Sequence, residues 1–337
     1  MKNVLYFNVG VGLDYEKELL IKWGVTDINL IEIDDHEYKK SFRDYVFDTK
    51  ANGLVVEYEE ITREVIETCP DLHMIATQSI GYNNIDIEAA KERGVLVSNC
   101  PGFCADEVAL HSVAMALDLA RQITFLDRTV REGKWDPLLG YPMKRLKGQT
   151  FGLVFFGDIP KRMVPVLHSL GLNILVYAPT KTVEFLKEYG CVKAETIDEL
   201  CEKSDFVSMH CPLIKDVTYH MMGEKQFKKM KKTAFFINTA RGSVVDEEAL
   251  VKALNTHEIE AAAIDVIEDE INEKSNLFGL PNVVMTPHSA FLSENSFYEA
   301  RRRALAHLVE ALSDCKVNDV EDAPVMNADH IPENRVV

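Results

Sequence analysis

Short apolar runs alternate with amphipathic stretches along the chain, and the alternation falls into two blocks. In the first hundred residues the apolar runs read as five strands: VLYFNVG from Val4, INLIEI from Ile28, GLVVEY from Gly53, HMIATQ from His73 and VLVSN from Val95. Between them, apolar residues at helical spacing indicate helices at 16–23, 38–46, 62–68 and 87–93. This alternation predicts right-handed crossovers and a parallel sheet.

A long helical segment at 106–121 separates the two blocks, and its Val108, His111 and Ser112 fall on one predicted buried face. The second block then contains six strand candidates: TFGLVFFG, NILVYAP, DFVSMHCP, TAFFINTA, AAAIDVI and NVVMTPH. A last amphipathic segment at 294–312 follows the second block. We therefore expect an α/β protein with two doubly wound parallel-sheet domains, one flavodoxin-like and one Rossmann-like, and a ligand-binding cleft between them.

The position of the last helix predicts that the first domain is discontinuous. Residues 1–102 plus 293–337 would form it, and residues 103–292 would form the second domain. The chain of 337 residues is long enough for two such cores.

Composition narrows the classes of partner. A formal net charge of -17 is unfavourable for nucleic acid and for anionic membrane surfaces, so we expect neither as a partner. An apolar stretch of about 18 residues, the length of a spanning helix, is absent. The first residues lack the long apolar core of a secretory signal, which favours a cytoplasmic protein. The seven cysteines show neither a CxxC pair nor zinc-ligand spacing, so we expect reduced thiols and no metal site.

The second block opens as a dinucleotide-binding unit does, with a strand, a tight turn and a helix. The fingerprint G-x-G-x-x-G would place glycines at 155, 157 and 160, but the turn FFGDIP keeps only Gly157. We expect pyrophosphate at Gly157, Asp158 and Ile159, and we expect the ring of Phe155 to crowd it. A strand, turn and helix without any ligand is the alternative reading of this segment.

The end of the next strand bears on the choice of cofactor. An acidic residue there normally binds the adenosine ribose and repels a 2′-phosphate, but this chain has Ala178. Thr180 and Lys181 follow and could supply a hydroxyl and a positive charge to that phosphate. The cofactor is therefore NAD or NADP, with NADP slightly favoured. The alternative is that Lys181 is a solvated surface lysine.

An arginine, a carboxylate and a histidine follow successive strands of the second block. Arg241 comes three residues after the run AFFIN, Glu270 follows the run AAAID, and His288 follows NVVMTP. Because parallel strands end at one edge of a sheet, we expect the three side chains to share that edge. Hydride reduction of a ketone uses such a set. The arginine binds a carboxylate and polarises the neighbouring carbonyl, the histidine donates a proton, and the carboxylate orients and charges the imidazole.

At these residues the chain resembles the D-isomer-specific 2-hydroxyacid dehydrogenase family, and the resemblance extends over nearly the whole sequence. NTARGSVVDEEALVKAL is similar to the family's arginine signature, AAAIDVIEDE to its Asp/Glu segment and NVVMTPHSAF to its histidine segment. SDFVSMHCPL and IGYNNIDIEAA also match in position. GFCADEVALHSVAMALDLAR is most similar to the branch that contains the C-terminal-binding proteins and their bacterial dehydrogenase relatives.

The resemblance implies that Arg241 binds the substrate, Glu270 pairs with the histidine and His288 is the acid/base. It implies that the N–H groups of Ile80 and Gly81 bind the substrate carboxylate. Three further residues would border the cofactor: Pro212, Ala240 and Asp265. The first domain would then bind the substrate and the second the dinucleotide, and the protein would be a homodimer.

These observations leave three functions open. The first is an oxidoreductase that transfers hydride from NAD(P)H to the 2-oxo group of a small 2-oxo acid, giving a D-2-hydroxy acid. The second is a nucleotide-sensing or scaffold protein of the same fold with little or no turnover. The third is an enzyme on this scaffold that no longer uses a dinucleotide. The arginine, glutamate and histidine favour the first function, and the altered glycine turn favours the other two.

Overall fold

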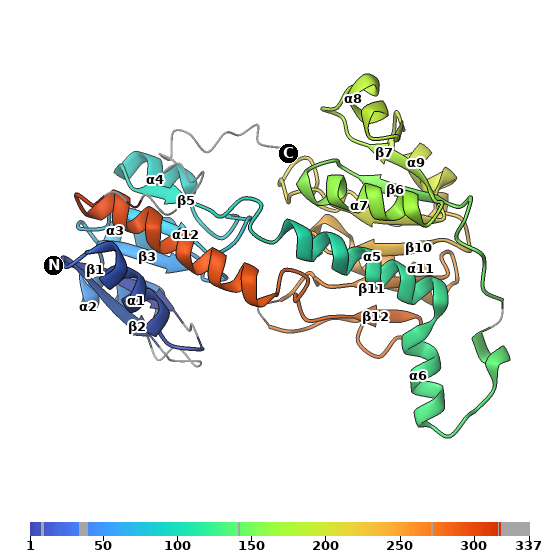
Figure 1. Cartoon of the computed structure of the whole chain (residues 1–337), viewed down its shortest axis with the longest axis horizontal. Coiled ribbons are helices and arrows are strands. Elements are labelled where there is room, and N and C mark those ends of the chain that lie inside the picture. The colour runs from blue at the N-terminus through green and yellow to red at the C-terminus, as the bar shows by residue number, and fades with distance from the viewer. Residues whose placement is uncertain (8–9, 34–39, 141, 271, 316, 318–337) are drawn as a thin grey trace. The chain divides into compact units, whose positions relative to one another are not determined.

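The computed structural model describes residues 1–7, 10–33, 40–140, 142–270, 272–315 and 317, which form two compact units (Figure 1). The first unit comprises Met1–Phe103 and the segment that starts at Ser293, and the second comprises Cys104–Leu292. Each unit is built around one parallel sheet, and this confirms the predicted fold class. Among the described residues, no helix combines the length and the apolarity that crossing a membrane requires.

The first unit contains the five strands that the sequence predicts. They are β1 (Lys2–Phe7), β2 (Ile28–Ile33), β3 (Gly53–Val56), β4 (Met74–Thr77) and β5 (Leu96–Ser98), in the order β2-β1-β3-β4-β5. Its helices are α1 (Asp14–Trp23), α2 (Phe42–Thr49), α3 (Arg63–Thr68), α4 (Ile87–Arg93) and α12 (Glu294–Leu312). Ser41 caps α2 by accepting a hydrogen bond from the N–H of Asp44. The predicted start at residue 38 lies outside the described residues.

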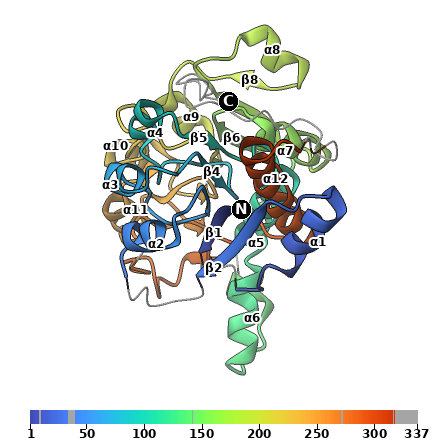
Figure 2. The same ribbon diagram turned by 90° about the vertical axis from the view of Figure 1, so that its left-hand side faces the viewer.

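Alternate residues of β1 enter different cores, as the two-residue period of a strand requires. Leu5 and Phe7 pack with residues of α2, α3 and α4. Val4 and Tyr6 pack with residues of α1 and α12. The first unit therefore has three layers, and Figure 2 shows α1 and α12 on one side of β1 and β2, with α2, α3 and α4 on the other.

The second unit contains a seven-stranded parallel sheet. Its strands are β6 (Thr150–Val154), β7 (Asn173–Tyr177), β8 (Val192–Lys193), β9 (Phe206–Met209), β10 (Phe235–Asn238), β11 (Ala261–Ile264) and β12 (Val283–Met285). Their order is β12-β11-β10-β9-β6-β7-β8, so β6 and β9 are neighbours although β7 and β8 lie between them in sequence. Strand order reverses at this pair, and ligands of doubly wound sheets bind at such a point.

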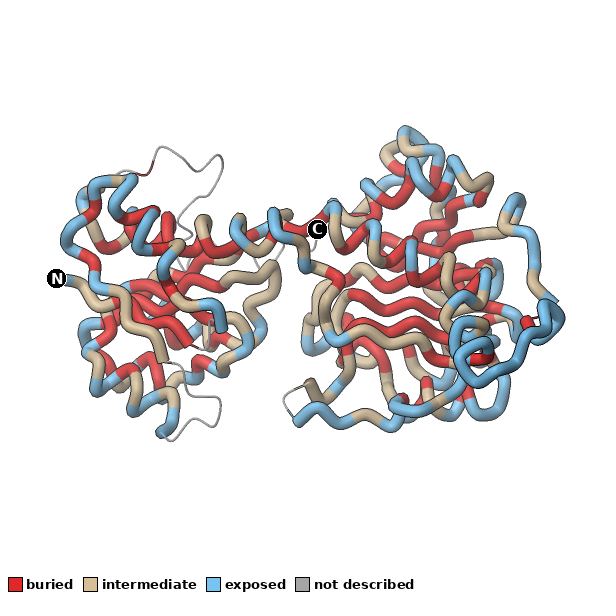
Figure 3. The backbone as a smooth tube through the Cα atoms, turned by 60° about the horizontal axis from the view of Figure 1, so that its bottom comes forward, coloured by how far each residue is buried: buried red, intermediate tan, exposed pale blue. Residues whose placement is uncertain are grey.

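Helices cover both faces of the second sheet. One face packs against α5 (Ala105–Arg121), α7 (Asp158–Ser169) and α8 (Val183–Glu188). The other packs against α9 (Ile197–Lys203), α10 (Glu224–Lys229) and α11 (Glu247–Asn255). The helix α6 (Ile123–Arg131) and the 3-10 turn Pro137–Gly140 contribute few buried residues, whereas the central strands β6, β9, β10 and β11 are buried along most of their length (Figure 3).

Candidate active site

The loop that carries Arg241 is held by hydrogen bonds to the side chain of Asn238, the last residue of β10. The Asn238 side chain donates from Nδ2 to the Arg241 carbonyl at 2.9 Å and accepts the Ala240 N–H on Oδ1 at 3.0 Å. These two bonds fix the turn from which the arginine projects. The guanidinium also donates to the Ala240 carbonyl at 2.7 Å. The arginine therefore starts from a defined backbone at the carboxyl end of the sheet.

Gly242 lets this loop approach the glutamate segment closely. A Cβ atom at this position would lie 1.8 Å from the carbonyl oxygen of Ile267 and 2.6 Å from the nitrogen of Glu268. Contacts this short do not occur between real side chains and backbone, so only glycine fits. The absence of a side chain at one residue thus sets the spacing between the arginine loop and the segment that leads to Glu270.

The histidine loop is shaped by Asp265, which directly follows β11 and is 3% exposed. Its Oδ1 accepts the Thr286 hydroxyl at 2.5 Å and the Ser289 N–H at 2.9 Å, and Oδ2 accepts the Ala290 N–H at 3.0 Å. The His288 N–H donates to the Asp265 carbonyl at 2.8 Å. His288 has a φ of 49°, which is unfavourable for a residue with a side chain, and these bonds hold it there.

His288 and Glu270 form a close pair. The distance between His288 Nδ1 and Glu270 Oε2 is 2.9 Å, and both side chains are partly exposed. The paired nitrogen fixes the ring, so Nε2 is the nitrogen directed away from the glutamate. Glu247 holds the same segment from α11, since its carboxylate accepts the N–H of Glu268 and the hydroxyl of Ser275. The sequence contains no signal for this role of Glu247.

One helix contacts both loops. His111 Nε2 lies 3.1 Å from Thr286 Oγ1 in the histidine loop, and Ser112 Oγ lies 2.7 Å from Thr239 Oγ1 in the arginine loop. Helical spacing predicts His111 and Ser112 on a buried face of this helix, but their partners lie more than a hundred residues away, so the sequence does not indicate them. Two consecutive residues of α5 therefore contact two loops that follow different strands.

The turn after β6 keeps the shape of a nucleotide-binding turn without its first glycine. Phe155 takes the left-handed conformation with a φ of 72°, and its ring is 4% exposed within the core cluster that includes Val154 and Leu175. The expectation that this ring crowds the turn is therefore wrong, because the ring packs into the core. Gly157 is the N-cap of α7, and no side chain caps that helix. The N–H groups of Asp158 and Ile159 thus begin a helix, where intrahelical acceptors do not exist.

The other residues expected near a cofactor follow neighbouring strands. Ala178 is buried after β7, Thr180 is exposed, and Lys181 Nζ lies 5.6 Å from the centre of the Phe185 ring. Pro212 follows β9, and its carbonyl accepts the Thr218 hydroxyl at 2.5 Å.

The predicted residues of the second unit therefore all lie beyond the carboxyl ends of its parallel strands. They are Gly157, Asp158, Ile159, Thr180, Pro212, Ala240, Arg241, Asp265, Glu270 and His288. Ile80 and Gly81 belong to the first unit, in the turn after β4, and both are partly exposed.

Two buried thiols near these loops have raised pKa values. Burial raises the pKa of Cys104 to about 12, although Arg241 acts in the opposite direction. Burial also raises the pKa of Cys211 to about 12. Both thiols are therefore protonated at neutral pH. Within the described part of the chain, no cluster of three or more His, Cys, Asp or Glu residues is arranged to hold a metal ion.

Comparison with known proteins gives one consistent result. The sequence model described as "D-isomer specific 2-hydroxyacid dehydrogenase, NAD binding domain" matches residues 113–290. A glyoxylate reductase from Thermococcus litoralis is 42% identical over 262 residues, which cover 74% of this chain and 76% of the relative.

Solved structures agree with the sequence matches. The crystal structure of D-lactate dehydrogenase from Aquifex aeolicus complexed with NAD and lactic acid is 29% identical, with a TM-score of 0.80. The similarity covers 92% of this chain and 95% of that one. An acyclic imino acid reductase in complex with NADPH and D-Arg is 25% identical, with a TM-score of 0.77. It covers 94% of this chain and 100% of that one.

Proposed function

This chain belongs to the D-isomer-specific 2-hydroxyacid dehydrogenase family, and from that premise we infer the roles of its residues. It is an NAD(P)-dependent oxidoreductase that reduces the 2-oxo group of a small 2-oxo acid and gives a D-2-hydroxy acid. The observation that carries the residue assignment is the 2.9 Å pair between His288 and Glu270, on the same sheet edge as Arg241.

Each of the three residues has a defined task in this proposal. Arg241 binds the substrate carboxylate and polarises the adjacent carbonyl, because its planar fork of donors matches two oxygens at once. His288 gives the proton on Nε2 to the carbonyl oxygen as hydride reaches the carbon. Glu270 stabilises the imidazolium before that transfer and keeps Nδ1 protonated throughout.

The nicotinamide cofactor supplies the hydride, and the turn after β6 fits its pyrophosphate. Gly157 leaves the start of α7 uncapped, and the N–H groups of Asp158 and Ile159 would bind the phosphate oxygens. The benzyl group of Phe155 is buried in the core and does not obstruct them. Ala240, Asp265 and Pro212 would border the remainder of the cofactor.

We propose that NADPH binds at least as well as NADH. Ala178 removes the carboxylate that would repel a 2′-phosphate, and Thr180 and Lys181 lie next to it in sequence. Lys181 contacts Phe185 in this structure, so binding the phosphate would require its flexible side chain to turn from that ring.

For the substrate we propose a small 2-oxo acid of the size of glyoxylate. The family relatives that support this choice include the glyoxylate reductase that is 42% identical to this chain. By the family resemblance, the N–H groups of Ile80 and Gly81 in the first unit would bind the substrate carboxylate.

We also propose a homodimer in a reducing, cytoplasmic environment. Apolar side chains are exposed on α5, α6 and the segment that follows, among them Leu110, Ile123 and Trp135, the last of which is 88% exposed. Exposed apolar residues on successive elements of the chain favour an interface between protein chains. All seven cysteines are free thiols, as is usual in a reducing compartment. Sedimentation at micromolar concentration should give the mass of two chains, and a monomer would refute the dimer.

The reaction is tested by titrating the protein with NADH and NADPH, followed by turnover with glyoxylate, pyruvate and hydroxypyruvate. We expect tight binding of at least one dinucleotide and oxidation of it by at least one acid. Binding without turnover would instead support a nucleotide-sensing protein. Failure to bind either dinucleotide would support an enzyme that no longer uses one.

A further inference from the structure

The turn after β4 presents two adjacent backbone N–H groups whose hydrogen-bonding capacity is unused. Within the described part of the chain, the N–H groups of Ile80 and Gly81 donate no hydrogen bond, and both residues are partly exposed. Consecutive unused donors of this kind form a binding place for an anion when they point to the same side. Whether this turn can bind an anion therefore depends on the directions in which the two N–H groups point.

Three carbonyl groups of the same turn accept hydrogen bonds, and two of the donors come from one short segment. The Ser79 carbonyl accepts the Cys100 N–H at 2.9 Å, and the Ile80 carbonyl accepts Asn99 Nδ2 at 2.7 Å. The Gly81 carbonyl accepts the Ser79 hydroxyl at 2.6 Å. Two consecutive peptide carbonyls thus face the short segment formed by Asn99 and Cys100.

A trans peptide is planar, so its N–H points opposite to its carbonyl. Because the Ser79 carbonyl faces Cys100, the N–H of Ile80 faces away from it. Because the Ile80 carbonyl faces Asn99, the N–H of Gly81 also faces away. The two donors therefore point to the same side of the turn, and the Asn99 side chain sets the second of them.

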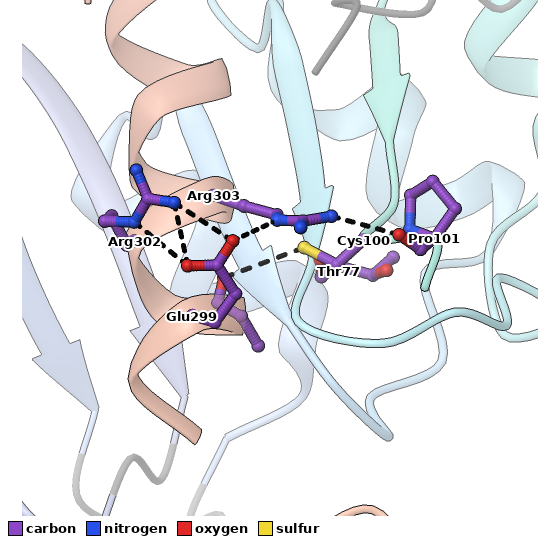
Figure 4. A network of polar contacts seen from close by, with 7 residues as sticks. Thr77, Cys100, Pro101, Glu299, Arg302 and Arg303 are labelled. Carbon is purple, nitrogen blue, oxygen red and sulfur yellow. Dashed lines mark hydrogen bonds and ion pairs between the residues drawn. The ribbon is translucent and has the colours of Figure 1, made fainter. Parts of the chain in front are cut away.

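The two residues that follow Asn99 are held by contacts with β4 and α12. The Cys100 thiol contacts the Thr77 carbonyl at 3.3 Å and the carbonyl of Ala300 on α12 at 3.6 Å. The carbonyl of Pro101 accepts a hydrogen bond from Arg303 on α12 at 3.0 Å. Figure 4 shows this arrangement, in which Glu299 also binds Arg303 at 2.6 Å and so fixes its guanidinium. The segment that carries Asn99 is therefore anchored to β4 and to α12.

We propose that Asn99 is a positioning residue for the substrate carboxylate: by binding the Ile80 carbonyl, it aims the Gly81 N–H at the anion. The assignment rests on the proposed function, since it takes a 2-oxo acid as the ligand of this turn. Asn99 acts through the peptide plane and does not touch the substrate.

The first test compares Asn99→Ala and Asn99→Asp with the wild type. We expect Asn99→Ala to raise the KM for glyoxylate roughly tenfold or more, the usual effect of misaligning a charge-assisted hydrogen bond, with a smaller change in kcat. The dissociation constant of NADH should stay within about twofold, because the nucleotide-binding turn belongs to the other unit. Asn52→Ala is the matched control, since Asn52 Nδ2 also donates to a backbone carbonyl, that of Asp71 at 3.0 Å, but at the amino end of β3.

Asn99→Asp separates positioning from a general loss of structure. Its carboxylate would face the Ile80 carbonyl as a second acceptor, whereas its protonated form can donate the missing hydrogen bond. Relative to the wild type, the affinity of Asn99→Asp for the unreactive carboxylate oxamate should therefore recover as the pH falls from 7 to 5. Asn99→Ala should show no such recovery. A merely structural role would leave the two variants with the same pH profile.

A second measurement does not depend on turnover. Ile80-Gly81 is the only Ile-Gly pair in the sequence, so carbonyl-13C isoleucine combined with 15N-glycine gives a single correlated amide signal, that of Gly81. Oxamate added to the NADH-loaded wild type should shift this signal, and Asn99→Ala should need roughly tenfold more oxamate for the same shift.

The outcomes distinguish this proposal from the proposed function. If the wild type reduces 2-oxo acids and Asn99→Ala binds oxamate within about twofold of it, the role of Asn99 is refuted and the function stands. An unmoved Gly81 signal in an active wild type would refute the turn as the carboxylate site. A wild type that neither binds oxamate nor reduces any 2-oxo acid would overturn both.

Discussion

Replacing Gly242 by alanine should push the arginine loop away from the segment that leads to Glu270, and so disturb the pair that Glu270 forms with His288. The new Cβ would lie 1.8 Å from the Ile267 carbonyl oxygen, and ordinary contact begins at 3.4 Å, so one loop must retreat by about 1.6 Å. Glu270 is three residues beyond Ile267, and its pair with His288 spans 2.9 Å. A movement of this size would lengthen that hydrogen bond beyond its useful range.

The expected effect follows from this displacement. A misplacement of about 1 Å in a catalytic group costs on the order of 10²-fold in rate, so kcat/KM should fall by at least about 10²-fold, or about 2.7 kcal/mol of transition-state stabilisation. Overpacking of this kind should also lower the free energy of unfolding by about 1–3 kcal/mol. The loss of activity should exceed what partial unfolding explains.

The assay is glyoxylate-dependent oxidation of NADH, with urea unfolding and NADH binding measured on the same samples. Gly223→Ala is the matched control, because a Cβ there would meet its nearest neighbour only at 3.8 Å, in ordinary contact. That variant should keep kcat/KM within about twofold, since nothing in the active loops must move. If folded Gly242→Ala retains kcat/KM within about threefold of the wild type, the two loops are not coupled through this contact.

Three further predictions concern proton transfer, cofactor choice and stability. His288→Ala should lower kcat by roughly 10²–10⁴-fold with NADH affinity unchanged, and Arg241→Lys should also lower kcat/KM severely; near-normal turnover of His288→Ala would refute the proton-donor role. Lys181→Ala should weaken NADPH more than NADH in fluorescence titrations, and equal NADPH affinity would show that this lysine does not bind the 2′-phosphate. Burial, with a smaller contribution from Arg303, lowers the pKa of His307 to about 4. The unfolded chain protonates this histidine near pH 6.5, so its stabilising effect is complete above that pH and is lost as the pH falls toward 4, by up to about 1.4 kcal/mol per pH unit. His307→Gln should flatten the dependence of urea stability on pH between 6.5 and 5, and an unchanged slope would contradict the assignment.

The periodic strands could be predicted from the sequence, and the exceptions have physical reasons. Eleven of the twelve strands in the two sheets correspond to apolar runs. The missed strand β8 has two residues at the edge of the sheet, and its Val192 is 63% exposed, so it leaves no apolar run. The helix α6 was not predicted either, because its Ile123 and Val130 are exposed and mark no buried face.

The turn after β6 shows how a motif can mislead. A missing glycine suggested that Phe155 would crowd the turn, because the sequence gives the identity of a residue but not the direction of its side chain. The left-handed backbone places that ring in the core, where its burial offsets the strain of the conformation, about 1–3 kcal/mol.

The residues that hold the loops of the candidate site could not be predicted from the sequence, for a different reason. Asn238, Glu247 and Asp265 act on segments that other strands bring to them, so the relevant pairing exists only after the sheet has formed. Asp265 was expected beside the cofactor because of the resemblance, and its carboxylate also binds the histidine loop.

Because the Asp265 carboxylate holds the histidine loop, the conformation of that loop depends on the order in which the sheet forms. The histidine loop follows β12, the edge strand. Its Ser289 and Ala290 N–H groups, however, donate to the carboxylate of Asp265, which follows the neighbouring strand β11. The positive φ of His288 is unfavourable by itself, so the loop depends on these bonds for its conformation. We therefore expect a chain whose last strand has not docked to lack an oriented His288, the proposed proton donor, even where its nucleotide turn is complete. Such incompletely folded molecules should be inactive, so we expect them not to oxidise reduced cofactor before the edge of the sheet has formed.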